Sequence, residues 1–322
     1  MINNATIKEI GKTLLHAGSV MLFPHESPDG DAIGACVALC RMLRNSGIAS
    51  WVLVDEELPE YVRFIDDGCC TADQEVISEP DICALIDCSG EDRIPGRSDK
   101  YREGKVHVCL DHHLAAYSDA DMYYIDDKEA AASQIIYKLI RSLNVTPDRV
   151  MANAIYAGIC SDTGNFQYSN TTEETHRIAA ELFAAGIDHN DIMVQLHQNV
   201  DERQIKLESA ALADMTIFAG GKGAIACIRQ KTLADCGALM EHGEHLIDVL
   251  RDMKGVEIAA VLKEKAPDMT KASFRAKTYA DVSKVAAIFG GGGHVKASGC
   301  TIHENVDTAR ESVMKAIEEA LR

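Results

Sequence analysis

Histidine and aspartate residues gather in a few short stretches of this sequence. In the first stretch, His25, Asp29 and Asp31 lie within one loop that also contains Pro28 and Gly30. Such a loop can aim one imidazole and two carboxylates at a single point, because proline and glycine favour a tight turn. These donors suit Mn²⁺, Mg²⁺, Fe²⁺ or Zn²⁺. The competing interpretation is an Asp-Gly turn in which Asp31 caps the following helix.

Two further stretches follow apolar runs. Asp87 comes directly after Ile82–Ile86, and the triplet Asp111-His112-His113 comes directly after Val106–Leu110. Adjacent histidines project in different directions, so one can bind a metal ion while the other meets a substrate. Asp111 can then fix the tautomer of an imidazole from behind. A satisfied polar turn is the competing interpretation of the triplet.

The fourth stretch contains Asp162, which follows the apolar segment Val150–Ile159 and precedes Gly164. A helix-terminal cap is its competing interpretation. If Asp162 joined the carboxylates of the other three stretches in one crevice, their repulsion would push several of them toward protonation. Two divalent ions would balance that charge. Ions about 3.5–4 Å apart can share a water, lower its pKa and clamp the oxygens of a displacement at phosphorus.

The elements that must position these residues alternate between helix and strand. Apolar patterns predict helices over 6–17 and 32–45, and buried strands over 19–23, 48–54, 82–86 and 106–110. Residues 133–186 have a helical pattern, in which Thr171 and Glu174 are expected to form a capping box. Open α/β sheets bind ligands outside the carboxyl ends of their strands. The sequence therefore predicts an α/β fold, with a mainly parallel sheet flanked by helices and the candidate ligands at one edge.

The rest of the chain predicts a second, smaller α/β domain. Strands are expected over 224–229, 257–263 and 271–277, and helices over 246–253, over 281–289 and from 306 to the end. Residues 188–216 are polar and helix-prone. A length of 322 residues suits two compact units. We expect a catalytic domain over 1–187, a connecting helix or linker over 188–206, and a substrate-binding domain over 207–322.

Composition restricts the class of partner. A formal net charge of −18 disfavours binding to long nucleic acid, because basic surfaces capture phosphate backbones. An anionic substrate would need local cations, and bound metal ions can supply them. The eleven cysteines form no Cys-x-x-Cys pair, which favours reduced thiols in a cytoplasmic protein. No apolar run approaches the roughly 18 residues of a membrane span, so no contact with a membrane is expected.

In this order and combination, the four stretches resemble the motifs of the DHH phosphoesterase superfamily, which is named for the triplet seen here at 111–113. The C-terminal part resembles the DHH-associated domain of that family. Its matching segments are Ser273-Phe-Arg275-Ala-Lys277, Asp281-Val-Ser-Lys284, Gly290-Gly-Gly-Gly293-His294 and Ser298-Gly299. The resemblance covers nearly the whole chain and looks closest to the NrnA-type group of bifunctional oligoribonucleases and pAp phosphatases. Ala276 departs from it, since many relatives carry serine there.

The resemblance implies roles for individual residues. One divalent ion, most often Mn²⁺ in this family, would be held by His25, Asp29 and Asp87. A second would be held by Asp31, Asp87, His112 and Asp162, so that Asp87 bridges the two. Catalysis would involve Asp87, Asp111 and His113, and His113 would touch the scissile phosphate. The residues implied in substrate binding are His113, Arg275, Lys277, Gly291, Gly292, Gly293 and His294.

The favoured interpretation is a dinuclear-metal phosphoesterase that uses a metal-bridging hydroxide. Its substrates would be small nucleotide phosphates: the 3′-phosphate of pAp (3′-phosphoadenosine 5′-phosphate), short oligoribonucleotides, or both. A phosphodiesterase acting on linear or cyclic dinucleotides would use the same site. A non-catalytic nucleotide sensor is the alternative from another class, but such a protein should show gaps among the metal ligands, and this sequence shows none. The oligomeric state stays open, with a homodimer as one option.

Overall fold

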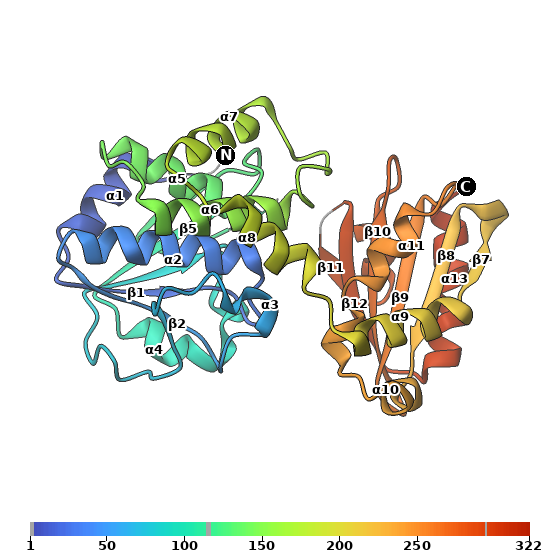
Figure 1. The fold of residues 1–322 in the computed structure, drawn as a ribbon. Helices are drawn as coiled ribbons and strands as arrows, with labels where there is room; N and C mark the ends of the chain where they lie inside the picture. The colour runs from blue at the N-terminus through green and yellow to red at the C-terminus, as the bar shows by residue number, and fades with distance from the viewer. Residues whose placement is uncertain (1–2, 114–116, 294) are drawn as a thin grey trace. The chain divides into compact units, whose positions relative to one another are not determined.

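The computed structural model describes residues 3–113, 117–293 and 295–322. The chain divides into two compact units between Asn199 and Val200 (Figure 1). This division falls inside the range 188–206 that was expected to connect two domains. None of the helices in the described ranges has the length and apolar character that crossing a bilayer requires.

A six-stranded sheet in the order β3-β2-β1-β4-β5-β6 forms the centre of the first unit, and all of its strand pairs are parallel. Its strands are β1 (Ser19–Phe23), β2 (Ala49–Leu53), β3 (Cys70–Thr71), β4 (Ile82–Ile86), β5 (Val106–Asp111) and β6 (Met122–Ile125). The predicted α/β class and parallel sheet are confirmed. The sequence missed β3 and β6, because both are short edge strands with partly exposed residues.

The chain order reverses at β1, which pairs with β2 on one side and with β4 on the other. Open α/β sheets bind ligands at such a switch point, because the loops that follow the two strands diverge to opposite faces. The loop that follows β1 contains the candidate stretch from His25 to Asp31, and the loop that follows β4 begins with Asp87. The topology therefore places His25 and Asp87 on either side of the crevice.

Helices cover both faces of this sheet. The cluster on one face contains residues of α1 (Ile7–Leu15), α2 (Gly30–Asn45), α3 (Glu60–Arg63), α5 (Ala132–Ser142), α6 (Arg149–Asp162), α7 (Glu173–Ala184) and α8 (His189–Met193). The other face packs against the short helix α4 (Ser98–Arg102) and the 3₁₀ turn η1 (Glu91–Arg93) with its neighbour η2 (Pro95–Arg97). A π-helical turn, Val194–Gln198, follows α8.

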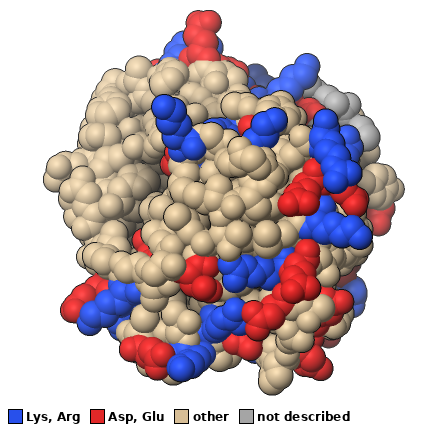
Figure 2. Space-filling view, turned by 90° about the vertical axis from the view of Figure 1, so that its right-hand side faces the viewer, with Lys and Arg blue, Asp and Glu red and all other residues tan. Residues whose placement is uncertain are grey.

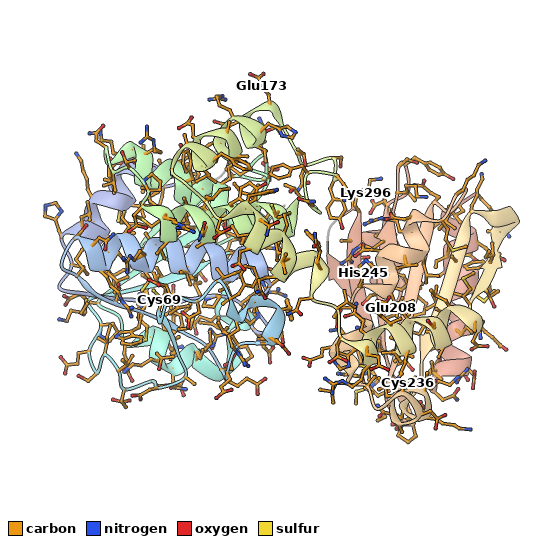
Figure 3. The ribbon with its side chains drawn as sticks, in the orientation of Figure 1. Cys69, Glu173, Glu208, Cys236, His245 and Lys296 are labelled. Atoms are coloured by element: carbon orange, nitrogen blue, oxygen red, sulfur yellow. The ribbon has the colours of Figure 1, made fainter. Side chains whose placement is uncertain are left out.

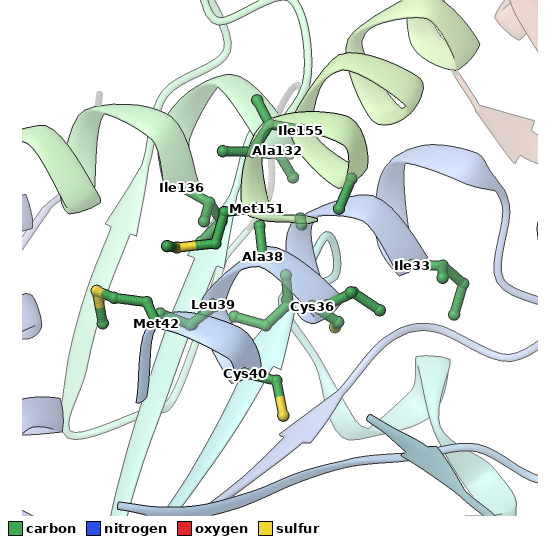
Figure 4. Packing of buried hydrophobic residues seen from close by; sticks show 14 of the residues in the cluster. Ile33, Cys36, Ala38, Leu39, Cys40, Met42, Ala132, Ile136, Met151 and Ile155 are labelled. Carbon is green, nitrogen blue, oxygen red and sulfur yellow. The ribbon is translucent and has the colours of Figure 1, made fainter. Parts of the chain in front are cut away.

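Helix α2 is buried nearly all round, as expected for a helix inside a core. Its Ala38 and Leu39 pack below Ile136 of α5 and Met151 of α6 (Figure 4). Removal of such side chains from water contributes roughly 25 cal/mol per Å² of apolar surface. This packing holds the N-terminus of α2, where Asp29 and Asp31 lie, in a fixed position.

Two glycines let α2 and α6 approach closely. A Cβ atom on Gly34 would lie 2.4 Å from the carbonyl oxygen of Ala154. One on Gly158 would lie 2.9 Å from Asp31 Oδ1 of α2 and 2.0 Å from Ser133 Oγ of α5. Any larger residue would therefore force the helices apart. The close crossing brings the first turn of α2 beside the last turn of α6, so that Asp31 and Asp162 reach the same point.

The N-terminus of α7 lies one residue later than predicted. Thr172, and not Thr171, is the N-cap: its hydroxyl accepts from the N–H of Thr175, and Thr175 Oγ1 accepts from the N–H of Thr172. Glu174 does not close the box and instead pairs with Lys138 at 2.7 Å. Adjacent threonines both fit the capping pattern, so the pattern alone could not choose between them.

The second unit contains another six-stranded sheet, in the order β11-β12-β10-β9-β8-β7, in which β8 and β9 are parallel and the other pairs are antiparallel. Its strands are β7 (Thr216–Phe218), β8 (Gly223–Ile228), β9 (Ile258–Ala266), β10 (Met269–Ala276), β11 (Gly292–Gly293) and β12 (Ala297–Ile302). Its helices are α9 (Glu202–Ala213), α10 (Gln230–Cys236), α11 (Leu246–Asp252), α12 (Val282–Ile288) and α13 (Val306–Ala320), with 3₁₀ turns at Ala219–Gly221 and Met240–Gly243. The predicted smaller α/β unit is confirmed.

The two faces of this second sheet are covered unequally. Helices α12 and α13 pack over β8, β9, β10 and β12 on one face. On the other face, α9, α10 and α11 pack over the buried residues of β8 and β9. The alternate residues of β10 and β12 on that face stay exposed or half-buried.

On the side of the molecule drawn in Figure 2, positive and negative side chains are interspersed, so the acidic charge is not gathered there.

Glu257, just before β9, organises the turn that follows β10. Its carboxylate is buried and accepts from the N–H groups of Thr278, Tyr279 and Ala280 and from the Thr278 hydroxyl. Burial alone would raise the pKa of Glu257, but these hydrogen bonds lower it below its usual value. The stabilisation is therefore complete above the unfolded pKa of about 4.3 and is lost as the pH falls through the native value.

We expect Glu257→Gln to lower the free energy of unfolding at pH 7 by about 1–3 kcal/mol, because charge-assisted hydrogen bonds in a buried site are lost. The difference from wild type should shrink as the pH falls below about 4. Urea unfolding followed by circular dichroism at both pH values measures this. Glu318→Gln, an exposed change on α13, is the control, and a pH-independent difference at Glu257 would contradict the account.

Candidate metal centre

The loop after β1 carries its acidic residues into the start of α2. Asp29 is the N-cap of this helix, and its Oδ1 accepts from the N–H groups of Asp31 and Ala32 at 3.0 Å. The competing interpretation of the sequence, in which Asp31 was the cap, is therefore wrong by two residues. Ser27 in the same loop has a φ of +52°, a conformation that costs energy for a residue with a side chain. The loop is held in one shape by the cap.

Asp31 caps a different helix, far away in the sequence. It is fully buried, and its Oδ2 and Oδ1 accept from the N–H groups of Ala132 (2.6 Å) and Ser133 (2.9 Å) at the start of α5. Ala131, the N-cap residue of α5, has no side chain that could satisfy these groups. Asp31 therefore joins α2 to α5 while its carboxylate also faces the cluster described below.

Asp87 lies at the centre of the site. It follows β4, has a φ of +61° and is only 2% exposed. Such a left-handed conformation is uncommon outside glycine and marks a residue held by its surroundings. Its N–H donates to Leu110 O of β5 at 3.0 Å. Among the described residues, none forms a hydrogen bond with Oδ1 of Asp87, although that atom is buried. A buried carboxylate oxygen without a donor is costly, and a cation would satisfy it.

His25 and His112 both point the Nε2 atom of the imidazole at the carboxylate of Asp87. Nδ1 of His25 donates to Glu26 O at 2.9 Å, and Nδ1 of His112 donates to Glu129 O at 3.2 Å. A carbonyl can only accept, so Nδ1 carries the proton in both rings and Nε2 faces the carboxylates. Nε2 of His25 lies 3.7 Å from Asp87 Oδ2, and Nε2 of His112 lies 3.3 Å from Asp87 Oδ1. This is the orientation that metal-ligating histidines adopt.

Asp162, the last residue of α6, contributes a further carboxylate to the cluster. Its Oδ2 lies 3.3 Å from His112 Nε2. Beyond it the chain turns sharply, with positive φ at Gly164, Asn165 and Phe166. Asn170 fixes this turn, because its Nδ2 donates both to Asp162 O and to Ala130 O at 3.0 Å. The sequence showed no sign of this positioning role of Asn170.

His113 and Asp111 form a separate pair beside the cluster. Nδ1 of His113 lies 2.7 Å from Asp111 Oδ1, which also accepts from the N–H groups of His112 and His113. Burial would raise the pKa of Asp111, but its hydrogen bond to His113 and the neighbouring imidazole charges lower it. An ionised Asp111 accepts a hydrogen bond from the Nδ1–H group and so orients the ring of His113.

The structure thus brings all six predicted ligands together in overlapping groups. One group is His25, Asp29 and Asp87, a second is Asp31, His112 and Asp162, and a third joins Asp87 to His112 and His113; within each group the ligand atoms lie within 4.8 Å of one another. Oδ2 of Asp87 faces the first group and Oδ1 faces His112 of the second. Hard oxygens with imidazole nitrogens could hold divalent cations.

The pKa shifts of the clustered residues show that the site is electrostatically unfavourable without a cation. Burial, followed by the charge of Asp31, raises the pKa of Asp87 well above its usual value. Burial also raises the pKa of Asp31. Burial lowers the pKa of His112, but the surrounding carboxylates Asp87, Asp162 and Asp31 raise it well above its usual value. Carboxylates that repel one another and draw protons into the site are what bound divalent ions would relieve.

A polar network behind His112 was not predicted. Glu129, whose carbonyl orients His112, is 8% exposed, and its carboxylate accepts from Gln134 Nε2 at 2.5 Å and pairs with Lys138. Gln134 in turn accepts from the hydroxyl of Thr175 at 3.1 Å. These contacts join residues of α5 and α7 that are up to about forty positions apart, so no local sequence pattern could reveal them.

In the second unit, the predicted substrate residues differ in what they contact. Arg275 lies on the partly uncovered face of β10, and its guanidinium donates only to Phe274 O, at 3.2 Å, among the bonds recorded for the described residues. Lys277 is committed to Met253 O at 2.7 Å, at the C-terminal end of α11, where it satisfies a helix carbonyl. Lys296, labelled in Figure 3, donates to Ala280 O at 3.1 Å and to Thr278 O.

The glycine run has a structural reason as well. Gly292 and Gly293 form β11 and pair with Gly299 and Ser298 of β12. A Cβ on Gly291 would lie 2.2 Å from Gly299 O, so no other residue fits there. Gly293 has a φ of +135°, which residues with a side chain rarely adopt. His294, the last residue of the predicted binding loop, lies outside the described residues.

Comparison with known proteins agrees with this arrangement. Residues 19–159 match the DHH family N-terminal domain, and residues 219–322 match the DHHA1 domain. The chain therefore contains a DHH domain followed by a DHHA1 domain. The resemblance inferred from the sequence is thereby confirmed, and the matched DHH segment contains most of the clustered ligands.

Relatives match over nearly the full length of this chain. The bifunctional oligoribonuclease and PAP phosphatase NrnA of Thermus thermophilus is 29% identical over 94% of this chain and 90% of its own length. NrnA of Bacillus subtilis is 25% identical over 92% of this chain and 93% of its own. An exopolyphosphatase-related protein from Bacteroides fragilis shares the fold, with a TM-score of 0.91 at 24% identity over 97% of this chain and 95% of that one.

We expect Asp87→Asn to raise the melting temperature in EDTA by about 2–5 °C, because a buried charge that lacks a hydrogen-bond partner is removed. The same change should abolish the rise in melting temperature that Mn²⁺ gives wild type, since bound ions stabilise only the native state. Differential scanning fluorimetry measures both effects. Asp127→Asn, at an exposed position, serves as the control; a normal Mn²⁺ response in Asp87→Asn would contradict its role as a ligand.

Proposed function

We propose that this DHH protein is a phosphoesterase that hydrolyses small nucleotide phosphates with the help of two divalent ions. Its substrates would be short oligoribonucleotides, the 3′-phosphate of pAp, or both. The observation that carries the proposal is the placement of Asp87, whose two buried carboxylate oxygens face two separate groups of ligand atoms. The names of the two NrnA relatives, which match nearly the whole chain, supply the substrate class.

In this proposal, His25, Asp29 and Asp87 hold one ion, and Asp31, Asp87, His112 and Asp162 hold the other. The mixture of carboxylates and imidazoles suits Mn²⁺ and contains no thiolate. When bound, the ions supply positive charge to a phosphate and make coordinated water more acidic at neutral pH. The buried Asp87 and Asp31 would fix where those ions bind, because the backbone N–H of Asp87 donates to β5 and the carboxylate of Asp31 accepts from the start of α5.

We assign the scissile phosphate to Nε2 of His113, the ring atom opposite Nδ1. Asp111 orients that ring and keeps the proton on Nδ1, so Nε2 can exchange a proton with a phosphate or leaving-group oxygen. The side chain of His113 is 34% exposed, in contrast to the more deeply buried imidazole of His112. This difference suits one histidine that holds an ion and another that meets substrate.

We assign a second phosphate of the substrate to the C-terminal unit. Arg275 presents a guanidinium, which contacts phosphates through two parallel hydrogen bonds. No side chain at Gly291, Gly292 or Gly293 would keep an anion away from the backbone there, although the N–H of Gly291 already donates to Ala286 O. We retain His294 in this proposal from the family resemblance, whereas Lys277 would act at longer range because its ammonium is bound to a helix end.

The location and assembly of the protein are also part of the proposal. The eleven cysteines are all free thiols, and most are buried. Reduced, packed cysteines favour a cytoplasmic protein. The partners would be small nucleotides or short RNA, with no long nucleic acid and no membrane.

A substrate panel tests the proposal. Purified protein is treated with EDTA, resupplied with Mn²⁺, and incubated with pAp, pApA, a five-nucleotide RNA, a cyclic dinucleotide and pyrophosphate. Mass spectrometry should detect AMP and phosphate from pAp and mononucleotides from the RNA. Binding of these nucleotides without product release would instead indicate a sensor, and release from the cyclic dinucleotide alone would indicate a second-messenger phosphodiesterase.

Two variants separate the metal site from the substrate site. We expect Asp87→Ala to lower kcat for every substrate by about 10³-fold or more, because an ion pair contributes several kcal/mol to the transition state. Arg275→Ala should raise KM by about 5–20-fold with a smaller effect on kcat, since one charge-assisted contact is lost. Steady-state kinetics with Mn²⁺ give both values. Full activity of Asp87→Ala would rule out the bridging role.

A further inference from the structure

A row of polar side chains along β10 remains partly uncovered. Ala272, Phe274 and Ala276 point into the core under α12 and α13. Because side chains alternate along a strand, Lys271, Ser273 and Arg275 lie on the opposite face. Lys271 is exposed, while Ser273 and Arg275 are half-buried. The helices of that face pack mainly over β8 and β9, although α11 also approaches β10, so Ser273 and Arg275 are partly accessible and Lys271 is exposed.

The charges of this row are not neutralised. Within the described ranges, no carboxylate lies within ion-pairing distance of Lys271 or Arg275. Lys263, the direct neighbour of Lys271 across the sheet, is buried and is paired with Glu244 at 2.6 Å. Like charges opposite one another destabilise a sheet. In a chain of net charge −18, two cations without acidic partners on one strand indicate a site for an anion.

The neighbouring strand leaves space for a ligand. Strand β12 places Ala297 opposite Arg275, Gly299 opposite Ser273, and Thr301 opposite Lys271. Because these side chains are small, the surface of β12 lies lower than the longer cationic side chains of β10 beside it. A flexible, extended molecule could therefore lie along β10 without displacing protein atoms.

The spacing of the row fits a chain of phosphates. Alternate residues of a strand are about 6.7 Å apart, so Lys271 lies about 13 Å from Arg275. Adjacent phosphorus atoms of an oligonucleotide are joined by six bonds, which span at most about 7.6 Å, because three bonds span 3.8 Å across a peptide. The two phosphates of pAp are separated by the same six bonds. With the scissile phosphate at the metal centre and the other phosphate at Arg275, as proposed above, pAp has no phosphate left for Ser273 or Lys271, whereas an oligoribonucleotide has further ones.

We propose that Lys271 is a binding site for an additional phosphate, one that an oligoribonucleotide has and pAp lacks. The row Lys271, Ser273 and Arg275 would then hold successive phosphates of a short RNA along β10. This inference rests on the proposed function and names the residue that favours oligoribonucleotides over a single nucleotide bisphosphate.

The test compares the two substrates in one variant. With Mn²⁺ present, Lys271→Ala should lower kcat/KM for a five-nucleotide RNA by about 5–10-fold, as expected for the loss of one phosphate contact, and change kcat/KM for pAp by less than about twofold. The slope of log kcat/KM against log salt concentration should become shallower by about 0.7–1 for the RNA only. Lys271→Arg should retain the wild-type ratio, because the charge is kept.

Lys315→Ala is the matched control, since this exposed lysine lies on α13, which packs on the opposite face of the same sheet. It should alter neither substrate. An equal fall for RNA and pAp in Lys271→Ala, or no fall for RNA, would overturn the inference while leaving the proposed function intact. Wild-type protein that hydrolyses neither substrate would overturn the proposed function and this inference together. Melting temperatures of all variants exclude unfolding as the cause.

Discussion

The repulsion among buried carboxylates at the ends of β1, β4 and α6 is the constraint on which the rest of the structure depends. Asp87 and Asp31 are placed where water cannot solvate them, and burial raises the pKa of both. A protein gains no stability from such an arrangement, so the surrounding fold must hold it. The parallel sheet fixes Asp87, the glycine crossing of α2 and α6 brings Asp31 toward Asp162, and the N-terminus of α5 donates to Asp31.

The first unit supplies orientation as well as charge. Two carbonyl groups, of Glu26 and Glu129, hold the proton on Nδ1 of His25 and His112, so that Nε2 of each ring faces the carboxylates. The carboxylate of Asp111 holds the proton on Nδ1 of His113 in the same way. The second unit has the opposite character, because Lys271 and Arg275 of β10 have no acidic partner among the residues that the structure describes. One unit thus suits cations and the other suits phosphates, the two components of the proposed chemistry.

Sequence reasoning pointed to the clustered acidic and histidine residues because each stretch follows an apolar run, and the carboxyl ends of parallel strands meet at one edge. It could not find the contacts that join distant segments. Asp31 caps a helix about a hundred residues away, and Asn170 ties Asp162 to Ala130, yet neither leaves a local pattern. The capping residues shifted by one or two positions, from Asp31 to Asp29 and from Thr171 to Thr172, because several neighbours could serve. Strand β12 was missed since its small residues lack a strand-like apolar pattern, and with it the open row on β10.

The central claim is that Asp87 is shared by two ions. Crystals grown with Mn²⁺ and measured near the manganese absorption edge test it directly, because anomalous difference density locates the metal without reference to the protein. The account predicts two peaks, one beside Oδ2 of Asp87 with His25 and Asp29, and one beside Oδ1 with Asp31, His112 and Asp162. A single peak, or peaks away from Asp87, would contradict it.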